Sequence, residues 1–399
     1  MNRILHLTNQ NEIITEMKKV GVSSQGIRAM SDKAFGLVIK LKHVKTGAAN
    51  IIKQDMLSLG GDAAVARGVV NGQIERSDVI ILGNENNIKK LLNKLSHQNI
   101  FEIPELRKDI QQLLYLRNKQ QEKFINARGY QLNLNRTLIM GIVNISPDSF
   151  YDGGKHNRKD EAILHIEKMI ENGADIIDIG GESTRPFATK ISVAEELERI
   201  MPIIEESLKK FDIPLSVDTY KSEVAKKALQ TGVHIINDIS GLNFDKKMAS
   251  TIAQYSDVPV VVMHIQGTPQ NMQKNPKYND VIEDIIDFLS RSIQIGENAG
   301  INQNNFIIDP GIGFGKTVLH NMEIIKRISE FKCLGKPILL GCSNKSFIGK
   351  ILKSEKSERL EGTLAVNSYG IMNGVNILRV HEVRENKKMA QMIDALRKT

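Results

Sequence analysis

From residue 137 onward the chain repeats one unit eight times, an apolar strand followed by a helix, and this repetition limits the possible folds most strongly. Short runs rich in β-branched residues alternate with longer segments whose apolar residues have helical spacing. The expected strands are 138–143, 175–179, 213–217, 233–237, 258–263, 305–309, 337–341 and 375–380. The expected helices are 160–172, 192–210, 221–231, 245–256, 280–299, 320–333, 357–373 and 385–397. Such alternation is typical of a parallel sheet.

The number of units indicates how this sheet closes. Eight strand–helix units within about 260 residues match the size of a (β/α)8 TIM barrel. A doubly wound open sheet is the alternative α/β architecture. The count of eight, together with the polar residues described below, favours the barrel, which we place at residues 126–399.

Residues 1–125 have a different pattern and predict a smaller N-terminal α+β domain, to which we assign no function. Its expected strands are 3–7, 35–41, 63–70 and 79–82, and its expected helices are 12–20, 25–30, 47–59 and 86–95. Residues 104–125 are helical in pattern and polar, so we expect them to connect the two domains. No catalytic group of side chains is recognisable in this part of the chain.

Composition excludes several classes of protein. No apolar run reaches the roughly 20 residues that span a bilayer, and the N-terminal residues lack the apolar core of a signal peptide. Residues 1–125 carry 19 Lys and Arg against 12 Asp and Glu, but no basic cluster with interleaved aromatic residues, so we expect no nucleic-acid partner. Cys333 and Cys342 have no metal-ligand spacing, and we expect reduced thiols in a cytoplasmic protein.

Each unit of the predicted barrel places polar residues where its strand ends. In chain order they are Asn144, Glu182 to Pro186 (following Asp178), Asp218, Asn237 with Asp238, His264, Asp309, Ser343 to Ser346, and Arg379 with His381. In a barrel all eight strand ends surround one face, where active sites lie. The mixture of carboxylates, amides, guanidinium, ammonium and imidazole groups suits a polar heterocycle that also carries an anionic group.

The residue types predict individual roles. Arg379 and His381 suit phosphate oxygens, and Asn144 could share a Mg²⁺ ion with a phosphate, because Mg²⁺ keeps waters and needs few protein ligands. Lys345 can donate to a carbonyl or ring nitrogen. Structural roles compete at three positions: Asp178 as an internal hydrogen-bonding residue, His264 as a core histidine, and Asp238 as a turn cap. The stretch from Gly311 to Thr317 is no P-loop, because position 310 is proline.

At this point residues 137–397 resemble the bacterial dihydropteroate synthase family. The matching motifs are Met-Gly-Ile-Val-Asn from Met140, Gly-Gly-Glu-Ser-Thr-Arg-Pro from Gly180, Ser-Val-Asp-Thr-Tyr-Lys from Ser216, Asn-Asp-Ile-Ser-Gly from Asn237, Met263-His264, Asp-Pro-Gly-Ile-Gly-Phe-Gly-Lys from Asp309, Ser-Asn-Lys-Ser from Ser343, and Arg-Val-His from Arg379. The resemblance implies a pterin-binding barrel and a transferase of folate biosynthesis. Its reaction would join 6-hydroxymethyl-7,8-dihydropterin diphosphate to 4-aminobenzoate, giving dihydropteroate and diphosphate.

The resemblance also implies site residues. Asp309, Asn237 and Asp218 would hold the pyrimidine side of the pterin, and Lys345 its carbonyl and N5 side. Asn144 would bind Mg²⁺, and Arg379 with His381 would bind the diphosphate. The remaining expected substrate-binding residues are Thr184, Arg185, Pro186, Met263, Gly313, Phe314 and Ser346. Asp218, Lys345 and Arg379 are the expected catalytic residues, Asp148 and Phe150 lie on the first of two loops expected to close over the site, and the family suggests a homodimer.

Three positions depart from the family pattern: Asn344 stands where arginine is usual, and Phe187 and Tyr151 where small residues are usual. The first two lie near the expected 4-aminobenzoate region, so they bear on substrate fit and sulfonamide response. Two other functions are the alternatives. One is a methyltetrahydrofolate-dependent methyltransferase, which shares the pterin barrel. The other is a pterin-binding protein without turnover.

Overall fold

The computed structural model describes residues 3–7, 9–118, 124–145, 155–186 and 188–398. The chain divides into two compact units, Met1–Lys119 and Gln120–Thr399, compared with the boundary expected near residue 125. No helix in the described parts of the chain combines the length and the apolar character needed to cross a membrane.

The first unit is a three-stranded antiparallel sheet on which α3, α4 and α5 pack, whereas α1 and α2 bury no residue. Its strands are β1 (Gly36–Lys45), β2 (Asp62–Val65) and β3 (Arg76–Asn84), in the order β1-β3-β2. Its helices are α1 (Gln10–Lys19), α2 (Ser24–Met30), α3 (Thr46–Ser58), α4 (Glu85–Leu95) and α5 (Ile103–Asn118). Alternate strand residues such as Ile39 and Ile81 point into a core shared with Ile52 and Leu91.

The second unit is the barrel. Its strands are β6 (Leu138–Asn144), β7 (Ile176–Gly180), β8 (Leu215–Asp218), β9 (Ile235–Asp238), β10 (Val260–Met263), β11 (Phe306–Asp309), β12 (Leu339–Leu340) and β13 (Ile377–Val380). All are parallel, in the order β11-β10-β9-β8-β7-β6-β13-β12. A parallel bridge between Ile308 and Ile338 joins β11 to the start of β12, so the sheet closes and the expected (β/α)8 barrel is confirmed.

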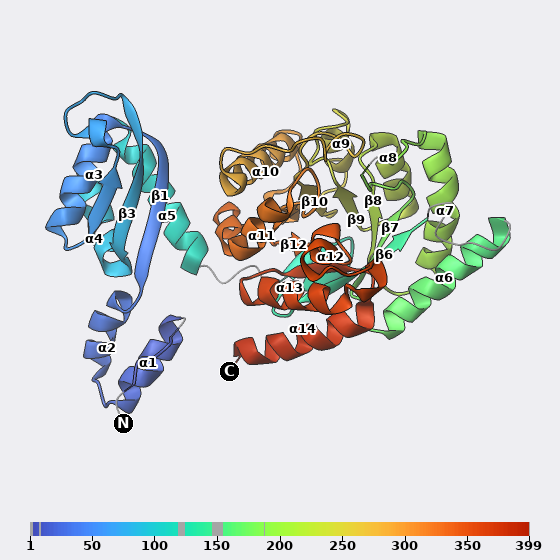
Figure 1. Ribbon diagram of the computed structural model, residues 1–399, viewed down its shortest axis with the longest axis horizontal. Coiled ribbons are helices and arrows are strands. Elements are labelled where there is room, and N and C mark those ends of the chain that lie inside the picture. The colour runs from blue at the N-terminus through green and yellow to red at the C-terminus, as the bar shows by residue number, and fades with distance from the viewer. Residues whose placement is uncertain (1–2, 8, 119–123, 146–154, 187, 399) are drawn as a thin grey trace. The chain divides into compact units, whose positions relative to one another are not determined.

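Helices surround these strands (Figure 1). They are α6 (Lys155–Glu171), α7 (Val193–Lys210), α8 (Ser222–Thr231), α9 (Met248–Ile252), α10 (Val281–Asn298), α11 (Val318–Lys326), α12 (Ser346–Leu352), α13 (Leu360–Met372) and α14 (Val383–Lys398). Strand residues alternate between two apolar cores. Ile139 and Val143 of β6 face the helices, whereas Leu138 and Met140 face the barrel interior.

A short hairpin closes the bottom of the barrel. Strands β4 (Phe124–Ala127) and β5 (Tyr130–Asn133) contribute Ile125, Ala127 and Leu132 to the interior core, next to the first residues of the barrel strands. Arg128 donates to the carbonyls of Leu229 and Val233, which fastens the hairpin to the barrel. The sequence analysis did not predict this hairpin.

Other differences concern the first unit and the shortest elements. Residues 3–7 form no strand. The connector predicted over residues 104–125 is wrong, because α5 buries Ile103, Leu106, Ile110 and Leu114 in the core of the first unit. Those residues recur at helical spacing, so the signal was present in the sequence. Helix α12 was missed, and the helix expected at 245–256 is reduced to α9.

Candidate active site at the carboxyl ends of the barrel strands

The polar residues of the site form one layer inside the barrel. Most of them lie two positions after an apolar residue of the inner core on the same strand, and we call that lower apolar layer the barrel floor. The inner core contains Ile176, Ile235, Val261, Ile307 and Ile377, each near the start of its strand. Two residues further along, every one of these strands carries a residue of interest. They are Asp178, Asn237, Met263, Asp309 and Arg379. Successive side chains of a strand alternate between faces, so these five point into the same interior, one layer above the floor.

Arg379 connects this layer. Its Nε donates to Asp178 Oδ2 at 2.7 Å, and its Nη2 donates to Asp218 Oδ2 at 2.7 Å. Asn237 Nδ2 donates to the same Asp178 oxygen at 3.0 Å. Asp178 is 0% exposed, so its contacts agree with the internal hydrogen-bonding role considered for it. The structure thus brings Arg379, Asp218 and Asn237 together around a residue that the sequence left ambiguous.

The surroundings of Asp218 favour its protonated form. Burial raises the pKa of Asp218 to about 7, and the carboxylates of Asp178 and Glu196 act in the same direction, whereas Arg379 opposes the shift. A carboxyl group with such a pKa can change charge near neutral pH. Perturbed titration in a polar layer at the active face of a barrel is typical of functional residues.

Asp309 is both a turn cap and an open acceptor. Its Oδ1 accepts from the Gly311 backbone N–H at 2.7 Å, which fixes the start of the glycine-rich loop. Gly311 has φ +69°, and a Cβ there would lie 1.9 Å from the His264 carbonyl oxygen, so only glycine fits. Burial raises the pKa of Asp309, while the Gly311 N–H and Lys345 oppose this.

Lys345 stands between the acidic layer and an apolar wall. Its Nζ lies 4.3 Å from the centre of the Phe314 ring, a cation–π distance, and its stem approaches Gly313. Burial lowers the pKa of Lys345 to about 8, with Arg379 acting in the same direction and Asp309 against it. Phe314 and Met263 belong to one apolar cluster. Gly313, Phe314, Met263 and Lys345 are therefore neighbours of the polar layer, as a ring-binding site would require.

His381 and Asn344 belong to a second set of contacts, at the ends of β12 and β13. His381 Nδ1 lies 2.9 Å from Ser343 Oγ, and burial with nearby Arg379 lowers the pKa of His381 to about 3. His381 is therefore neutral near pH 7 in the unliganded protein. Asn344 Nδ2 donates to Glu382 Oε1 at 2.8 Å, and Ser343 Oγ donates to Glu382 Oε2. The side chain that replaces the usual arginine thus ties the two strand ends together.

Asn144 ends β6 with its side chain exposed at the active face. Its Oδ1 and Asp218 Oδ2 both lie within 4 Å of the position that a Cβ on Gly180 would take. An amide oxygen on the same side of the site as a carboxylate oxygen is the kind of ligand that Mg²⁺ prefers. Among the described residues no group of three or more His, Cys, Asp or Glu side chains forms a metal site.

The remaining expected residues lie at the edge of the face. Thr184 is half-buried and Arg185 and Pro186 are exposed, on the loop between β7 and α7, and Ser346 is exposed at the start of α12. Asp148, Phe150, Tyr151 and Phe187 lie outside the described residues. Within the described residues no hydrogen bond or ion pair joins Thr184, Arg185 or Pro186 to the polar layer, so a substrate role for this loop stays a prediction.

Asp238 and His264 show the structural contacts that competed with functional roles. Asp238 accepts from the backbone N–H groups of Ser240 and Leu242, as a turn cap does. His264 is buried, with Nδ1 2.8 Å from Lys316 Nζ, and burial lowers the pKa of both side chains well below their usual values. Lys316 also donates to the Phe314 carbonyl at 3.0 Å, so it braces the glycine-rich loop. The sequence analysis considered this lysine only as part of a failed P-loop.

Comparison with known proteins identifies the family. Residues 140–381 match the model of the pterin binding enzymes. The dihydropteroate synthase of Bacillus subtilis is 47% identical over 261 residues, which cover 65% of this chain and 89% of that protein. This chain belongs to the dihydropteroate synthases, within the pterin binding enzymes. A structure of the Xanthomonas albilineans dihydropteroate synthase with 4-aminobenzoic acid matches with a TM-score of 0.66 at 38% identity, over 69% of this chain and 99% of that one.

The first unit of this dihydropteroate synthase lies outside the family match. A probable bifunctional folylpolyglutamate synthase/dihydropteroate synthase of Halobacterium salinarum is 37% identical over 381 residues. That alignment covers 96% of this chain and 45% of the archaeal protein, so it includes most of the first unit. The archaeal protein therefore has a segment similar to the first unit, and that segment also precedes its dihydropteroate synthase part.

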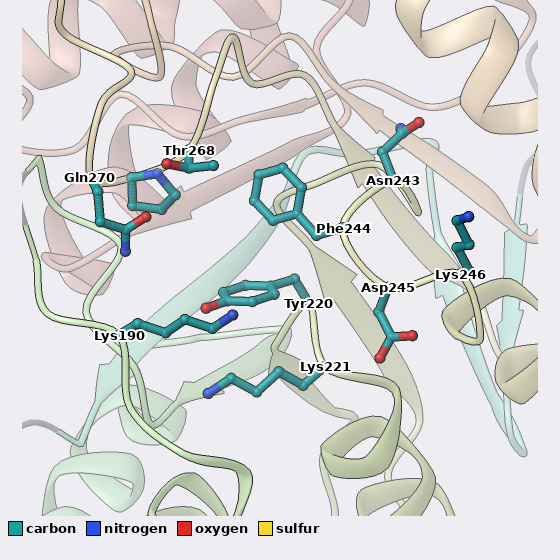
Figure 2. A pocket seen from close by; sticks show the side chains of 10 residues that line it. Lys190, Tyr220, Lys221, Asn243, Phe244, Asp245, Lys246, Thr268 and Gln270 are labelled. Atoms are coloured by element: carbon teal, nitrogen blue, oxygen red, sulfur yellow. The ribbon is translucent and has the colours of Figure 1, made fainter.

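A cavity of about 530 Å³ lies beside the expected site (Figure 2). It is bordered by the loops that follow β7, β8, β9 and β10, and none of the expected site residues lines it. Lys221 on its wall is buried among carboxylates. The sequence analysis included Lys221 in the motif that starts at Ser216, and Glu182 in the Glu-Ser-Thr-Arg-Pro motif, but assigned Lys221 no role.

Proposed function

We propose that this chain condenses 6-hydroxymethyl-7,8-dihydropterin diphosphate with 4-aminobenzoate, giving 7,8-dihydropteroate and diphosphate. The observation that carries the proposal is the layer of Asp178, Asp218, Asn237, Asp309 and Arg379 inside a barrel of this family. A buried layer rich in acceptors, with one guanidinium and a nearby ammonium group, is complementary to a pterin ring. The 4-aminobenzoic acid bound to the Xanthomonas protein supports the second substrate.

The acidic layer would hold the pterin by its hydrogen-bonding edge. The pyrimidinone side of the ring presents an amino N–H and a ring N–H side by side, which a carboxylate can accept together. Asp309 Oδ1 is already bonded to Gly311, which orients the carboxylate and leaves Oδ2 directed towards the interior near Gly341. Asn237, held by Asp178, can offer its amide oxygen, and Lys345 can donate to the ring carbonyl and N5.

The departing diphosphate needs compensation of its charge. Arg379 supplies a permanent cation, and His381 can donate as a neutral imidazole. Asn144 would hold Mg²⁺, whose positive charge would further stabilise the diphosphate as it leaves. As the bond to oxygen breaks, the electron-rich dihydropterin can stabilise the cationic CH₂ group. The neutral aryl amine of 4-aminobenzoate is then a sufficient nucleophile, and the site needs no strong base.

The loop with Thr184 and Arg185, together with Phe314, Lys345 and Ser346, would surround 4-aminobenzoate. Phe314 offers an apolar ring face, and its neighbour Lys345 has a lowered pKa, so this ammonium can lose its proton more readily than an exposed lysine. After the carbon–nitrogen bond forms, the amine nitrogen must release a proton. Lys345, with a pKa of about 8, is mostly protonated at neutral pH, so the released diphosphate or solvent would take this proton.

A homodimer and a cytoplasmic location belong to the same proposal. Exposed apolar side chains gather on three neighbouring helices, α11, α12 and α13: Leu319, Met322, Ile351, Leu352, Tyr369 and Met372. Tyr369 OH donates to the Lys326 carbonyl, which joins α13 to α11. Such a patch is typical of a protein interface, and a second copy is the occupant we propose. The free thiols of Cys333 and Cys342 suit a reducing compartment.

Release of diphosphate from the pterin diphosphate, with and without 4-aminobenzoate, tests the function. We expect release that depends on 4-aminobenzoate and forms dihydropteroate, detected by mass spectrometry, and that stops when EDTA removes divalent metal. Arg379→Met should abolish it, whereas the matched control Arg384→Met, an exposed arginine of α14, should not. Pterin binding without turnover, or methyl transfer from methyltetrahydrofolate, would instead support one of the two alternative functions.

A further inference from the structure

Lys221 is a buried cation at the base of the loop that carries Thr184 and Arg185. It lies three residues after the end of β8, immediately before α8, and is 7% exposed. Its Nζ lies 2.6 Å from Glu182 Oε2 and 2.6 Å from Glu196 Oε2, and it donates to the Ile191 carbonyl at 2.8 Å. Lys221 therefore contacts both the first and the last residue of segment 182–191.

The neighbours of Lys221 strengthen the same attachment. Tyr220 OH donates to Glu182 Oε1 at 2.7 Å, so both oxygens of this carboxylate are held from the loop after β8. The side chains of Glu182 and Glu196 are 5% and 1% exposed. Burial raises the pKa of Glu196, and Lys221 opposes that rise. Without this lysine, two buried carboxylates would face each other without a cation.

Between its two attached ends the segment is held only lightly within the described structure. Gln270 Nε2 donates to the Ala188 carbonyl at 3.3 Å. Lys190 projects over the cavity of about 530 Å³, opposite Tyr220 and Lys221 (Figure 2). Of the described residues in this segment, Lys190 borders the cavity, and Arg185, Pro186 and Thr189 are exposed, so much of its middle part is not packed against the barrel. The position of Thr184 and Arg185 then depends on Glu182 and Ile191, and through them on Lys221.

We infer that Lys221 is a positioning residue for 4-aminobenzoate binding, acting through the segment 182–191. This inference rests on the proposed function for the identity of the substrate. The attachment of segment 182–191 to Lys221 does not depend on that function. In the described contacts Lys221 makes no hydrogen bond or ion pair with the pterin-layer residues Asp178, Asp218, Asn237, Asp309 and Arg379, and its partner Glu196 acts on Asp218 only through its charge. Its removal should therefore affect the second substrate much more than the first.

The test compares Lys221→Met with Lys226→Met, an exposed lysine of α8, the helix that begins directly after Lys221. In the unliganded full-length protein, backbone hydrogen exchange in 182–191 should become about 10-fold faster in Lys221→Met and stay unchanged in the control. The KM for 4-aminobenzoate should rise on the order of 10-fold or more, because small displacements of a substrate-positioning group are costly. The KM for the pterin diphosphate should change less than about twofold.

Lys221→Arg should restore part of the lost affinity, because it keeps the buried positive charge. If Lys221→Met does not fold, the triple variant Lys221→Met, Glu182→Gln, Glu196→Gln removes the unpaired carboxylates and should show the same changes. Calorimetric binding of 4-aminobenzoate, in the presence of a non-reactive pterin and diphosphate, gives a measurement that requires no turnover.

Unchanged exchange in 182–191, or faster exchange with unchanged affinity for 4-aminobenzoate, would overturn the inference. A wild type that releases no diphosphate would refute the proposed function. The hydrogen-exchange result would still show whether Lys221 holds segment 182–191 in place.

Discussion

Arg379 on β13 donates to Asp218 on β8 at 2.7 Å, although β6 and β7 lie between these two strands in the sheet. The guanidinium therefore crosses the inside of the barrel and, on its way, also binds Asp178 of β7. Two carboxylates thus share one cation in a buried layer. Because both carboxylates depend on the same guanidinium, the pKa of Asp218 and the effect of substitutions in this layer depend on Arg379.

The titration of Asp218 predicts a dependence of stability on pH. Its pKa in the folded protein, about 7, lies above the ordinary value of about 4, so the folded state holds this proton more tightly than the unfolded state does. The contribution of Asp218 to stability is present below pH 4 and is lost as the pH rises through 7. Relative to Asp218→Asn, the wild type should lose on the order of a few kcal/mol between pH 5 and pH 8. Urea unfolding at both values measures it, and an equal pH effect in both proteins would contradict the expectation.

Asp309→Asn should weaken pterin binding with little effect on folding. Asparagine keeps an acceptor for the Gly311 N–H but replaces the second oxygen by a donor, which would then face a donor of the pterin. An unsatisfied buried donor costs about 1–3 kcal/mol, and more when a charge is lost. This corresponds to a roughly ten- to hundredfold or greater loss of affinity. Calorimetry gives the affinity and thermal unfolding the stability, with exposed Asp257→Asn as control. Normal binding with a lowered melting temperature would assign Asp309 a purely structural role.

Removal of the first unit should leave turnover intact only if the hairpin is kept. Every expected site residue lies after residue 136, so a fragment of residues 120–399 should retain kcat and KM within about twofold of the full chain. A fragment of residues 130–399 loses β4 and with it Ile125 and Ala127 of the barrel floor. It should melt at a lower temperature or precipitate, because the inner core becomes exposed. Inactivity of a folded 120–399 fragment would show that the extension supports the site.

Charge placed on the apolar patch should dissociate the proposed dimer. Leu319 is 79% and Met372 55% exposed, so Leu319→Asp with Met372→Asp should not disturb the core. Light scattering coupled to gel filtration should give a dimer for the wild type and a monomer for the double variant. Leu164→Asp, which alters an exposed apolar residue of α6, is the matched control and should remain dimeric. A monomeric wild type at tens of micromolar, or a dimeric double variant, would reject this interface.

Local pattern was enough to predict the barrel and the position of its polar residues. Apolar strands of a parallel sheet are buried on both faces, so each of them stands out as a continuous run, and the polar residue that follows marks the carboxyl end. Asn144, Asp218, Asn237, Asp309 and Arg379 were found in this way. The hairpin of β4 and β5 escaped because four-residue strands give little periodic signal, even though Arg128 and Gly129 have the positive φ of a tight turn.

The partners of those residues followed only from the closed barrel. Arg379 is 201 residues from Asp178 and 161 from Asp218, and Lys221 is 39 residues from Glu182. The sequence predicts which side chains face the barrel interior, because the alternation along a strand is a local property. It does not state which inward side chains meet, because that depends on how the sheet curves and on the stagger between strands. Burial then changed the chemistry of the groups that met, since desolvation and a shared cation shift a carboxyl pKa in a way that no isolated residue could reveal.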